Sequence, residues 1–241
     1  MKVVLLVNNS NRGQALAHLI HRAGLNLKLV VVENASLLKT EEKSALSYVK
    51  QTLGPSYRLL RSIIKLSSKD RRALRYEGES MRNAEAKVNK YIEGLGVNGR
   101  PENIEYLEVP SLNSSIAVNA VVKAEPDLCV VMGTSILRSR MISIPKIGTI
   151  NAHTSILPEY RGARSEFWQC YNQDYRNVGV TLHFIDKGVD TGNILFQKKQ
   201  DVGENPDPNM LRANNTFAIL ENYVPIIEKV LKGEIEPKKQ G

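Results

Sequence analysis

Apolar and polar residues in the first half of the chain follow two alternating patterns. Short apolar runs predict four buried strands, at residues 2–8, 27–33, 104–109 and 127–132. Apolar positions at helical spacing predict helices between them, at residues 14–23 and 114–123. Strands that alternate with helices imply parallel, right-handed βαβ units. The pattern therefore predicts an α/β fold, a Rossmann-like, doubly wound and mostly parallel sheet with helices on both faces.

The second half continues with strands and helices of a slightly different order. Further strands are predicted at residues 147–153, 178–185 and 194–200, and the last two are expected to form a hairpin. Helices are predicted at residues 162–172 and 210–231. The aromatic side chains Phe167, Trp168 and Tyr171 are expected to pack the first of these helices on the sheet. Alternation in the strand at 178–185 leaves His183 on the face opposite its apolar residues, where it either faces a site or has a structural role.

A basic segment interrupts the alternation of strands and helices. Residues 39–90 hold 13 Lys and Arg against 6 Asp and Glu, which accounts for nearly all of the chain's net charge of +8. A narrow helical stripe within it consists of Leu59, Leu60, Ile63 and Ile64, and helix is expected through about 82–95. We expect one domain over residues 1–241, with a basic helical insertion at about 39–95.

Two interpretations of the basic segment stay open. It is either a solvated helix that covers the sheet or a docking surface for an acidic partner. An acidic partner would be an anionic membrane surface, which gives a peripheral membrane contact, or the diphosphate of a nucleotide sugar. The sequence does not indicate the oligomeric state.

The cysteine content and the apolar segments bear on the compartment. Only Cys129 and Cys170 are present, both within predicted core elements, which favours a reducing compartment without disulfides. The first residues have no signal-peptide pattern, and no apolar run is long enough to span a bilayer. We therefore expect a cytoplasmic protein.

Three polar side chains in the second half suggest a reaction centre. In a strand at 147–153, Asn151 and His153 point to the same side, so an amide lies beside an imidazole. Asp190 lies in a loop between Gly188 and Gly192, which are expected to allow positive φ and close approach of the backbone to a ligand. The chemistry that these groups suit is acyl transfer.

The turn after the first strand offers a second candidate binding region. It contains one glycine, so it is neither a dinucleotide fingerprint nor a P-loop. Its asparagines and serine predict a helix cap, while free amides of the helix N-terminus, with Asn9 and Arg12, could instead hold a phosphate.

The order of three motifs resembles the folate-dependent formyltransferase family, which includes glycinamide ribonucleotide, methionyl-tRNA and sugar-nucleotide N-formyltransferases. That family carries Asn-x-His, then S-L-L-P-x-Y-x-G, then D-x-G before a strand. Here these motifs are Asn151-Ala152-His153, residues 155–162 and Asp190-Thr191-Gly192. The resemblance is close over residues 127–200 and vague before them. It implies that Asn151, His153 and Asp190 are the catalytic residues.

The resemblance also implies the donor and its binding loops. The formyl donor would be 10-formyltetrahydrofolate, used as a co-substrate, and no metal is required. The residues expected to enclose its pterin are Ser135, Ile136, Leu137, Asp186 and Val189. The residues expected to bind the acceptor are Asn9, Arg12, Tyr160 and Arg161.

The acceptor is predicted by elimination among members of the resembled family. The turn at 8–13 departs from the glycine-rich phosphate loop of glycinamide ribonucleotide enzymes, and only about forty residues follow residue 200, where methionyl-tRNA enzymes carry a further barrel. The acceptor is therefore expected to be a small anionic molecule rather than a nucleic acid, namely the primary amine of a nucleotide-linked amino sugar in a polysaccharide pathway. The alternatives are a glycinamide ribonucleotide or methionyl-tRNA formyltransferase-like enzyme, or a folate-fold binding protein that does not catalyse.

Overall fold

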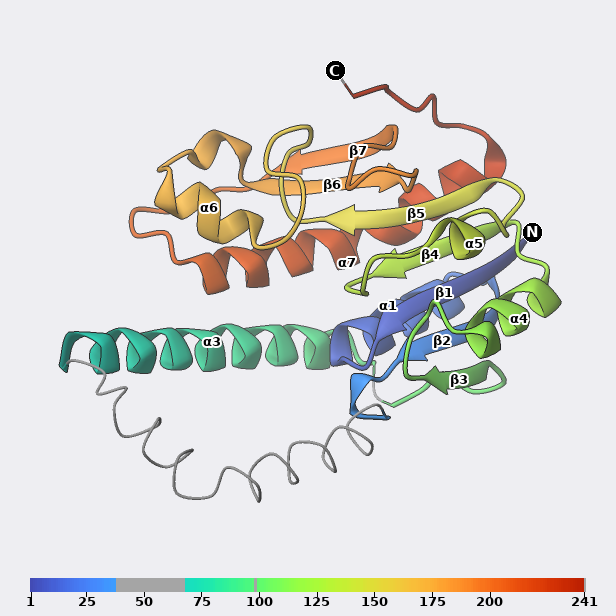
Figure 1. The fold of residues 1–241 in the computed structure, drawn as a ribbon, viewed down its shortest axis with the longest axis horizontal. Coiled ribbons are helices and arrows are strands. Elements are labelled where there is room, and N and C mark those ends of the chain that lie inside the picture. Colours follow the sequence, from blue (N-terminus) through green and yellow to red (C-terminus); the bar gives the residue numbers. More distant parts are fainter. Residues whose placement is uncertain (38–67, 98, 241) are drawn as a thin grey trace, which may run out of the picture.

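The structure of the protein is a computed structural model, which describes residues 1–37, 68–97 and 99–240. Seven strands form one sheet in the order β3-β2-β1-β4-β5-β6-β7 (Figure 1). The strands are β1 (Lys2–Asn8), β2 (Asn26–Glu33), β3 (Glu105–Val109), β4 (Leu128–Met132), β5 (Gly148–His153), β6 (Gly179–Phe184) and β7 (Ile194–Lys199). The first five run parallel, and β6 and β7 are antiparallel to their neighbours. The predicted mostly parallel sheet and its terminal hairpin are confirmed.

Helices cover both faces of the sheet, as predicted. One face carries α1 (Asn11–Arg22), α3 (Ser68–Gly94) and α7 (Pro208–Lys232), whose buried apolar side chains share a core with Val3, Leu5 and Val7. The other face carries α4 (Ser115–Ala124) and α5 (Ser139–Ile142), which pack against Val4 and Leu6. Alternate residues of β1 thus enter two cores, because successive strand side chains point to opposite faces.

The remaining helical segments lie outside these two layers. They are η1 (Ala35–Leu37), α6 (Ser165–Tyr171) and η2 (Tyr175–Asn177). The helix α3 projects well past the sheet, alongside α7 and toward α6 (Figure 1). The predicted stripe at Leu59, Leu60, Ile63 and Ile64 lies outside the described residues. None of the helices that the structure describes is both long and apolar enough to cross a membrane.

The aromatic residues of α6 differ from the sequence prediction. The side of α6 that is buried consists of Ser165, Glu166 and Gln169. The residues Phe167, Trp168 and Tyr171 are 40%, 49% and 73% exposed. They contact one another instead of the sheet, with ring centroids 5.3 to 6.3 Å apart. The prediction that they pack α6 on the sheet is wrong, because the helix turns its polar side inward, where Asn215 of α7 donates to Glu166 at 3.5 Å.

One buried hydroxyl fixes the strands that carry the candidate site. Tyr223 of α7 is fully buried, and its hydroxyl lies 2.7 Å from the carbonyl oxygen of Val131 in β4 and 3.1 Å from that of Ile150 in β5. Burial raises the pKa of this phenol far above its ordinary value, so the group stays a hydrogen-bond donor. The contact therefore ties α7 to the two strands immediately beside Asn151.

Candidate active site

The candidate site begins with two cross-strand neighbours. Asn151 of β5 lies opposite His183 of β6 in the antiparallel register, so their side chains share one face of the sheet. The amide nitrogen Nδ2 of Asn151 is 3.4 Å from Nε2 of His183. The other ring nitrogen, Nδ1, donates to the carbonyl oxygen of Phe184 at 2.8 Å, which leaves Nε2 to accept from the amide. His183 thus orients Asn151, and of the two roles left open by the sequence, the structure favours one in the site.

His153 is buried and faces two hydrogen-bond acceptors. Its Nε2 is 2.8 Å from the carbonyl oxygen of Tyr160, and its Nδ1 is 3.4 Å from Oδ2 of Asp190. Tyr160 has a φ of 54°, in the left-handed region, which aims its carbonyl at the ring. A neutral imidazole has one N–H and satisfies only one of these acceptors, whereas an imidazolium satisfies both. The surroundings are therefore arranged for a ring that gains a proton.

Asp190 connects both histidines. Its Oδ2 accepts from the backbone N–H of Gly162 at 2.9 Å, and its Oδ1 lies 3.5 Å from Nε2 of His183. Asp190 itself has a positive φ of 52°, whereas the sequence assigned positive φ to the flanking glycines. Gly192 is needed for another reason, because a Cβ there would lie 1.9 Å from the carbonyl oxygen of Phe184. The loop is thus held against β6 by close backbone approach.

The protonation of the cluster follows from its burial and charges. Burial lowers the pKa of His153, and the carboxylate of Asp190 and the carbonyl of Tyr160 oppose this shift without cancelling it. Burial works to raise the pKa of Asp190, but the closeness of His183 and His153 and the N–H of Gly162 favour the carboxylate and outweigh burial, so that pKa is lowered. The free protein near neutral pH therefore holds an ionised Asp190 beside a largely neutral His153. Because the ring is buried, the carboxylate of Asp190 does not keep His153 charged.

A cleft of about 350 Å³ opens beside these side chains. It is lined by Asn151, His153, His183 and Asp190, by residues 133–137 after β4, and by residues 185–190 after β6. Every predicted pterin-binding position, Ser135, Ile136, Leu137, Asp186 and Val189, lines this same cleft. The structure therefore brings the predicted donor loops and the three predicted catalytic side chains to one place. Within the described ranges, no group of three His, Cys, Asp or Glu side chains has the arrangement of a metal site.

The loop at residues 133–137, which forms one wall of the cleft, is held in place by two side chains that the sequence analysis did not single out. Glu33, the last residue of β2, accepts from the N–H and the hydroxyl of Ser135 at 2.9 and 2.7 Å. Asn113 donates to the carbonyl oxygen of Ile136 at 2.9 Å and accepts from the N–H of Arg138 at 2.7 Å. These bonds leave the Ile136 side chain 77% exposed as an apolar rim. A strand-end glutamate could have been suspected, because such ends meet at the ligand-binding edge of a parallel sheet.

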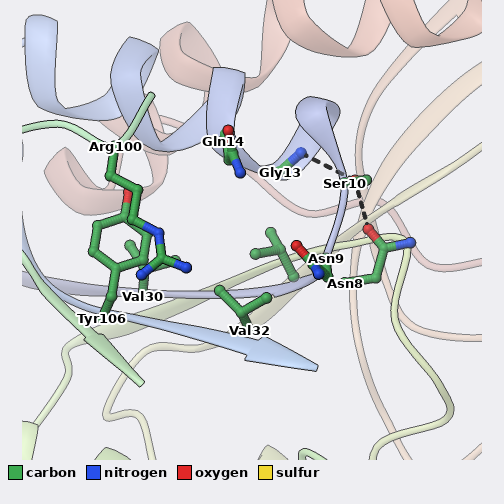
Figure 2. Close-up of a pocket in the computed structure, with 10 residues that line it drawn as sticks. Asn8, Asn9, Ser10, Gly13, Gln14, Val30, Val32, Arg100 and Tyr106 are labelled. Carbon is green, nitrogen blue, oxygen red and sulfur yellow. Dashed lines mark hydrogen bonds between the residues drawn. The ribbon is translucent and has the colours of Figure 1, made fainter. Parts of the chain in front are cut away.

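The predicted acceptor residues Asn9 and Arg12 do not line this cleft. Asn9 lines a separate cavity between α1, β2 and β3, and the cavity offers about 10 Å³, room for roughly one water molecule (Figure 2). Ser10 caps α1 by accepting from the N–H of Gly13 at 3.3 Å, which agrees with the predicted helix cap. Arg12 pairs with Glu85 of α3 at 2.6 Å.

The other two predicted acceptor residues lie in the loop between β5 and α6. The hydroxyl of Tyr160 donates to Asp174 at 3.2 Å, so its carbonyl, rather than its ring, reaches His153. The guanidinium of Arg161 bonds the side-chain oxygen of Gln240, at 3.2 Å from Nε and 2.8 Å from Nη2.

Comparison with known sequences decides the family. Residues 63–224, two thirds of the chain, match the sequence family described as Formyl transferase. The chain belongs to the formyl transferase family. It is 34% identical over 141 residues to the methionyl-tRNA formyltransferase of Citrifermentans bemidjiense, a match that covers 58% of this chain and 40% of that protein. It is 37% identical over 116 residues to the methionyl-tRNA formyltransferase of Thermodesulfovibrio yellowstonii, covering 48% of this chain and 37% of the relative. This formyl transferase family member thus spans well under half of the length of the curated relatives it matches.

Solved structures agree on the fold of this formyl transferase chain. The glycinamide ribonucleotide transformylase 1 of Symbiobacterium toebii superposes with a TM-score of 0.62 at 16% identity, covering 100% of this chain and 94% of the other. A sugar N-formyltransferase from Shewanella sp FDAARGOS_354 gives a TM-score of 0.59 at 14% identity, covering 99% and 72%. At these identities the likeness concerns the fold alone.

Proposed function

We propose that this protein transfers a formyl group from 10-formyltetrahydrofolate to a primary amine. The observation that carries the proposal is the convergence of Asn151, His153 and Asp190 on one cleft whose other walls are the loops at 133–137 and 185–190. Membership of the formyl transferase family supports the reaction class. The roles of the three side chains follow from the charges that such a reaction develops.

Attack of a neutral amine on the formyl carbon forms a tetrahedral intermediate with a negative oxygen. Asn151 is suited to donate to this oxygen, because its amide nitrogen Nδ2 is oriented by His183 at 3.4 Å at the edge of the cleft. A preorganised donor of this kind contributes on the order of 3–4 kcal/mol to transition-state stability. His153, which lines the same cleft, would add a positive charge near this oxygen once the ring is protonated.

The attacking nitrogen must also lose a proton. His153 has a lowered pKa and is largely neutral near neutral pH, so it can accept this proton. The imidazolium that forms would be satisfied on both sides, by Tyr160 and by the carboxylate of Asp190. Asp190 thus stabilises the charged ring and, directly or through a water, offers a second place for the proton. Collapse of the intermediate would then break the bond between the formyl carbon and N10 of the folate, and the proton taken from the amine would pass to N10, so that tetrahydrofolate leaves.

The donor would lie with its pterin between the two loops of the cleft. Ile136 is exposed on one loop and Val189 is 52% exposed on the other, so a flat ring could be enclosed between two apolar side chains. Backbone groups of residues 135–137 would bind its polar edge, although the N–H of Ser135 and the carbonyl of Ile136 already have partners within the protein.

We propose a nucleotide-linked amino sugar as the acceptor. The exposed aromatic platform Phe167–Trp168–Tyr171 belongs to the same helix as Ser165, whose hydroxyl is 3.3 Å from Nε2 of His153. Aromatic faces stack on sugar rings and on bases. Arg164, 5.1 Å from the Phe167 ring and 3.7 Å from Glu77, is a positive charge that an anionic carrier could share with this carboxylate. The second candidate acceptor is methionyl-tRNA, which the two curated relatives favour.

An acceptor panel with 10-formyltetrahydrofolate tests the proposal. The panel contains nucleotide-linked amino sugars, glycinamide ribonucleotide and methionyl-tRNA, release of tetrahydrofolate is followed, and the Asn151→Ala variant is the control. We expect formylation of at least one amino sugar by the wild-type protein and almost none by the variant. Formylation of methionyl-tRNA alone would show that methionyl-tRNA is the acceptor and would leave the proposed formyl transfer unchanged. Folate binding without transfer to any amine would instead identify a non-catalytic binding protein.

A further inference from the structure

The segment that follows α7 returns to the side of the sheet where β6 and β7 join (Figure 1). Lys238 forms an antiparallel bridge with Ile194, the first residue of β7, through N–H···O distances of 2.7 and 2.8 Å. Two residues further on, the side chain of Gln240 lies between the loop after β5, where it contacts Arg161, and the loop that carries Asp190. The segment is thus held in place by the backbone before its side chain makes contact.

The Gln240 amide uses every hydrogen-bonding position that it has. Its Nε2 donates to the carbonyl oxygens of Asp190 and Gly192 at 2.9 and 2.6 Å. Its Oε1 accepts twice from Arg161, from Nε at 3.2 Å and from Nη2 at 2.8 Å. Carbonyl oxygens can only accept and a guanidinium can only donate, so a side chain between them must offer both functions. A glutamine amide meets this demand, and a carboxylate or an ammonium group of similar length does not.

The two loops joined by Gln240 are also joined at the proposed reaction centre. Gly162, next to Arg161, donates its N–H to the carboxylate of Asp190 at 2.9 Å. Gln240 therefore holds the backbone of Asp190 and also binds Arg161. Gly162, the neighbour of Arg161, holds the Asp190 side chain. Asp190 has a positive φ, which L-residues adopt at a cost, so such a loop needs contacts that determine its conformation.

We propose that Gln240 is a positioning residue that locks the Asp190 loop to the loop after β5 and so fixes Asp190 against His153. This proposal rests on the proposed function for its kinetic consequence and on the structure alone for its conformational one. The Arg161 guanidinium is then part of the same lock, in place of the acceptor contact expected from the sequence.

The test compares Gln240→Ala and Gln240→Glu with Lys239→Ala, a change at the exposed neighbouring side chain. Loss of the Gln240 contacts should lower kcat about tenfold, the size expected for a lost hydrogen-bonded contact. The Michaelis constants of both substrates should stay within about twofold of wild type. Gln240→Glu should be as impaired as Gln240→Ala, because its carboxylate faces two carbonyl oxygens. The Lys239→Ala variant should match wild type.

Amide hydrogen exchange provides an arm that does not depend on formyl transfer. We expect the Gly162 amide to exchange about tenfold faster in both Gln240 variants, with no change in Lys239→Ala, and with thermal melting of all three near that of wild type. Unchanged exchange at Gly162 in folded Gln240→Ala protein would overturn the proposal. A change confined to the acceptor Michaelis constant would also overturn it and would assign Gln240 to acceptor binding through Arg161. Faster exchange at Gly162 in a protein that transfers no formyl group would support the positioning role of Gln240 and refute only the proposed function.

Discussion

Replacing Gly192 with alanine should displace Asp190, because the two backbone segments at this position lie close together. A Cβ at this position would lie 1.9 Å from the carbonyl oxygen of Phe184, whereas ordinary contact begins near 3.4 Å, so one backbone segment has to move by about 1.5 Å. The carbonyl that would move also accepts from Nδ1 of His183 at 2.8 Å. The change therefore displaces Asp190 and disturbs the ring that orients Asn151. A displacement of about 1 Å at a catalytic group costs on the order of 100-fold in rate, so kcat should fall by about that factor.

The assay is formyl transfer at saturating donor and acceptor, together with thermal melting of each variant. Gly94→Ala is the matched control, because a Cβ there meets nothing within 4 Å and its φ is not positive. We expect the control to have wild-type turnover and an equal or slightly higher melting temperature, since alanine favours helix more than glycine does. A Gly192→Ala protein with turnover within threefold of wild type would refute the account of how the Asp190 loop is positioned.

Three further predictions concern Asn151, His153 and the buried hydroxyl of Tyr223. Asn151→Ala should lower turnover by on the order of 100- to 1,000-fold, while binding of 5-formyltetrahydrofolate, measured by calorimetry, survives. In the double variant with Asp190→Asn, the loss of turnover should be smaller than the product of the two single losses. The pKa of His153, followed by NMR, should lie below its ordinary value of 6.5 and fall further in Asp190→Asn, because the carboxylate is what opposes the effect of burial; an unchanged or higher value would contradict this assignment. Tyr223→Phe should lower the free energy of unfolding by about 1–3 kcal/mol, measured by denaturant titration, because two buried carbonyl oxygens lose their common donor, and a loss under about 0.5 kcal/mol would show that they find other partners.

Much of the fold could be predicted because its strands and helices have strong, regular patterns. Continuous apolar runs indicated the parallel strands of the first half. The alternation in β6 correctly separated Val180 and Leu182, which lie in the core, from His183, which lines the cleft. Bounds differed by a few residues, as at α1, where Ser10 caps a helix that begins three residues earlier than its apolar spacing indicates. The mostly parallel order of the sheet followed from these elements.

The parts that could not be predicted depend on contacts between distant segments. Gln240 carries no local signal, because its value comes from meeting Arg161 and the carbonyl of Asp190 in space. The place of Glu33 at a strand end points to the ligand-binding edge of the sheet, but its contact with Ser135 is seen only in the folded sheet. The aromatic residues of α6 were misplaced for a related reason: hydrophobicity predicts burial, but the polar side of α6 faces the buried polar groups of α7.

The most direct test of the central claim is the fate of the formyl carbon in a single turnover. Donor labelled with ¹³C at the formyl carbon is mixed with excess protein and the best acceptor from the panel, and NMR follows the label in wild type and in Asn151→Ala. The account predicts a labelled formamide on the acceptor nitrogen with the wild-type protein and a rate at least 100-fold lower, in order of magnitude, with the variant. Equal rates in the two proteins, or a label that appears only as free formate, would contradict it.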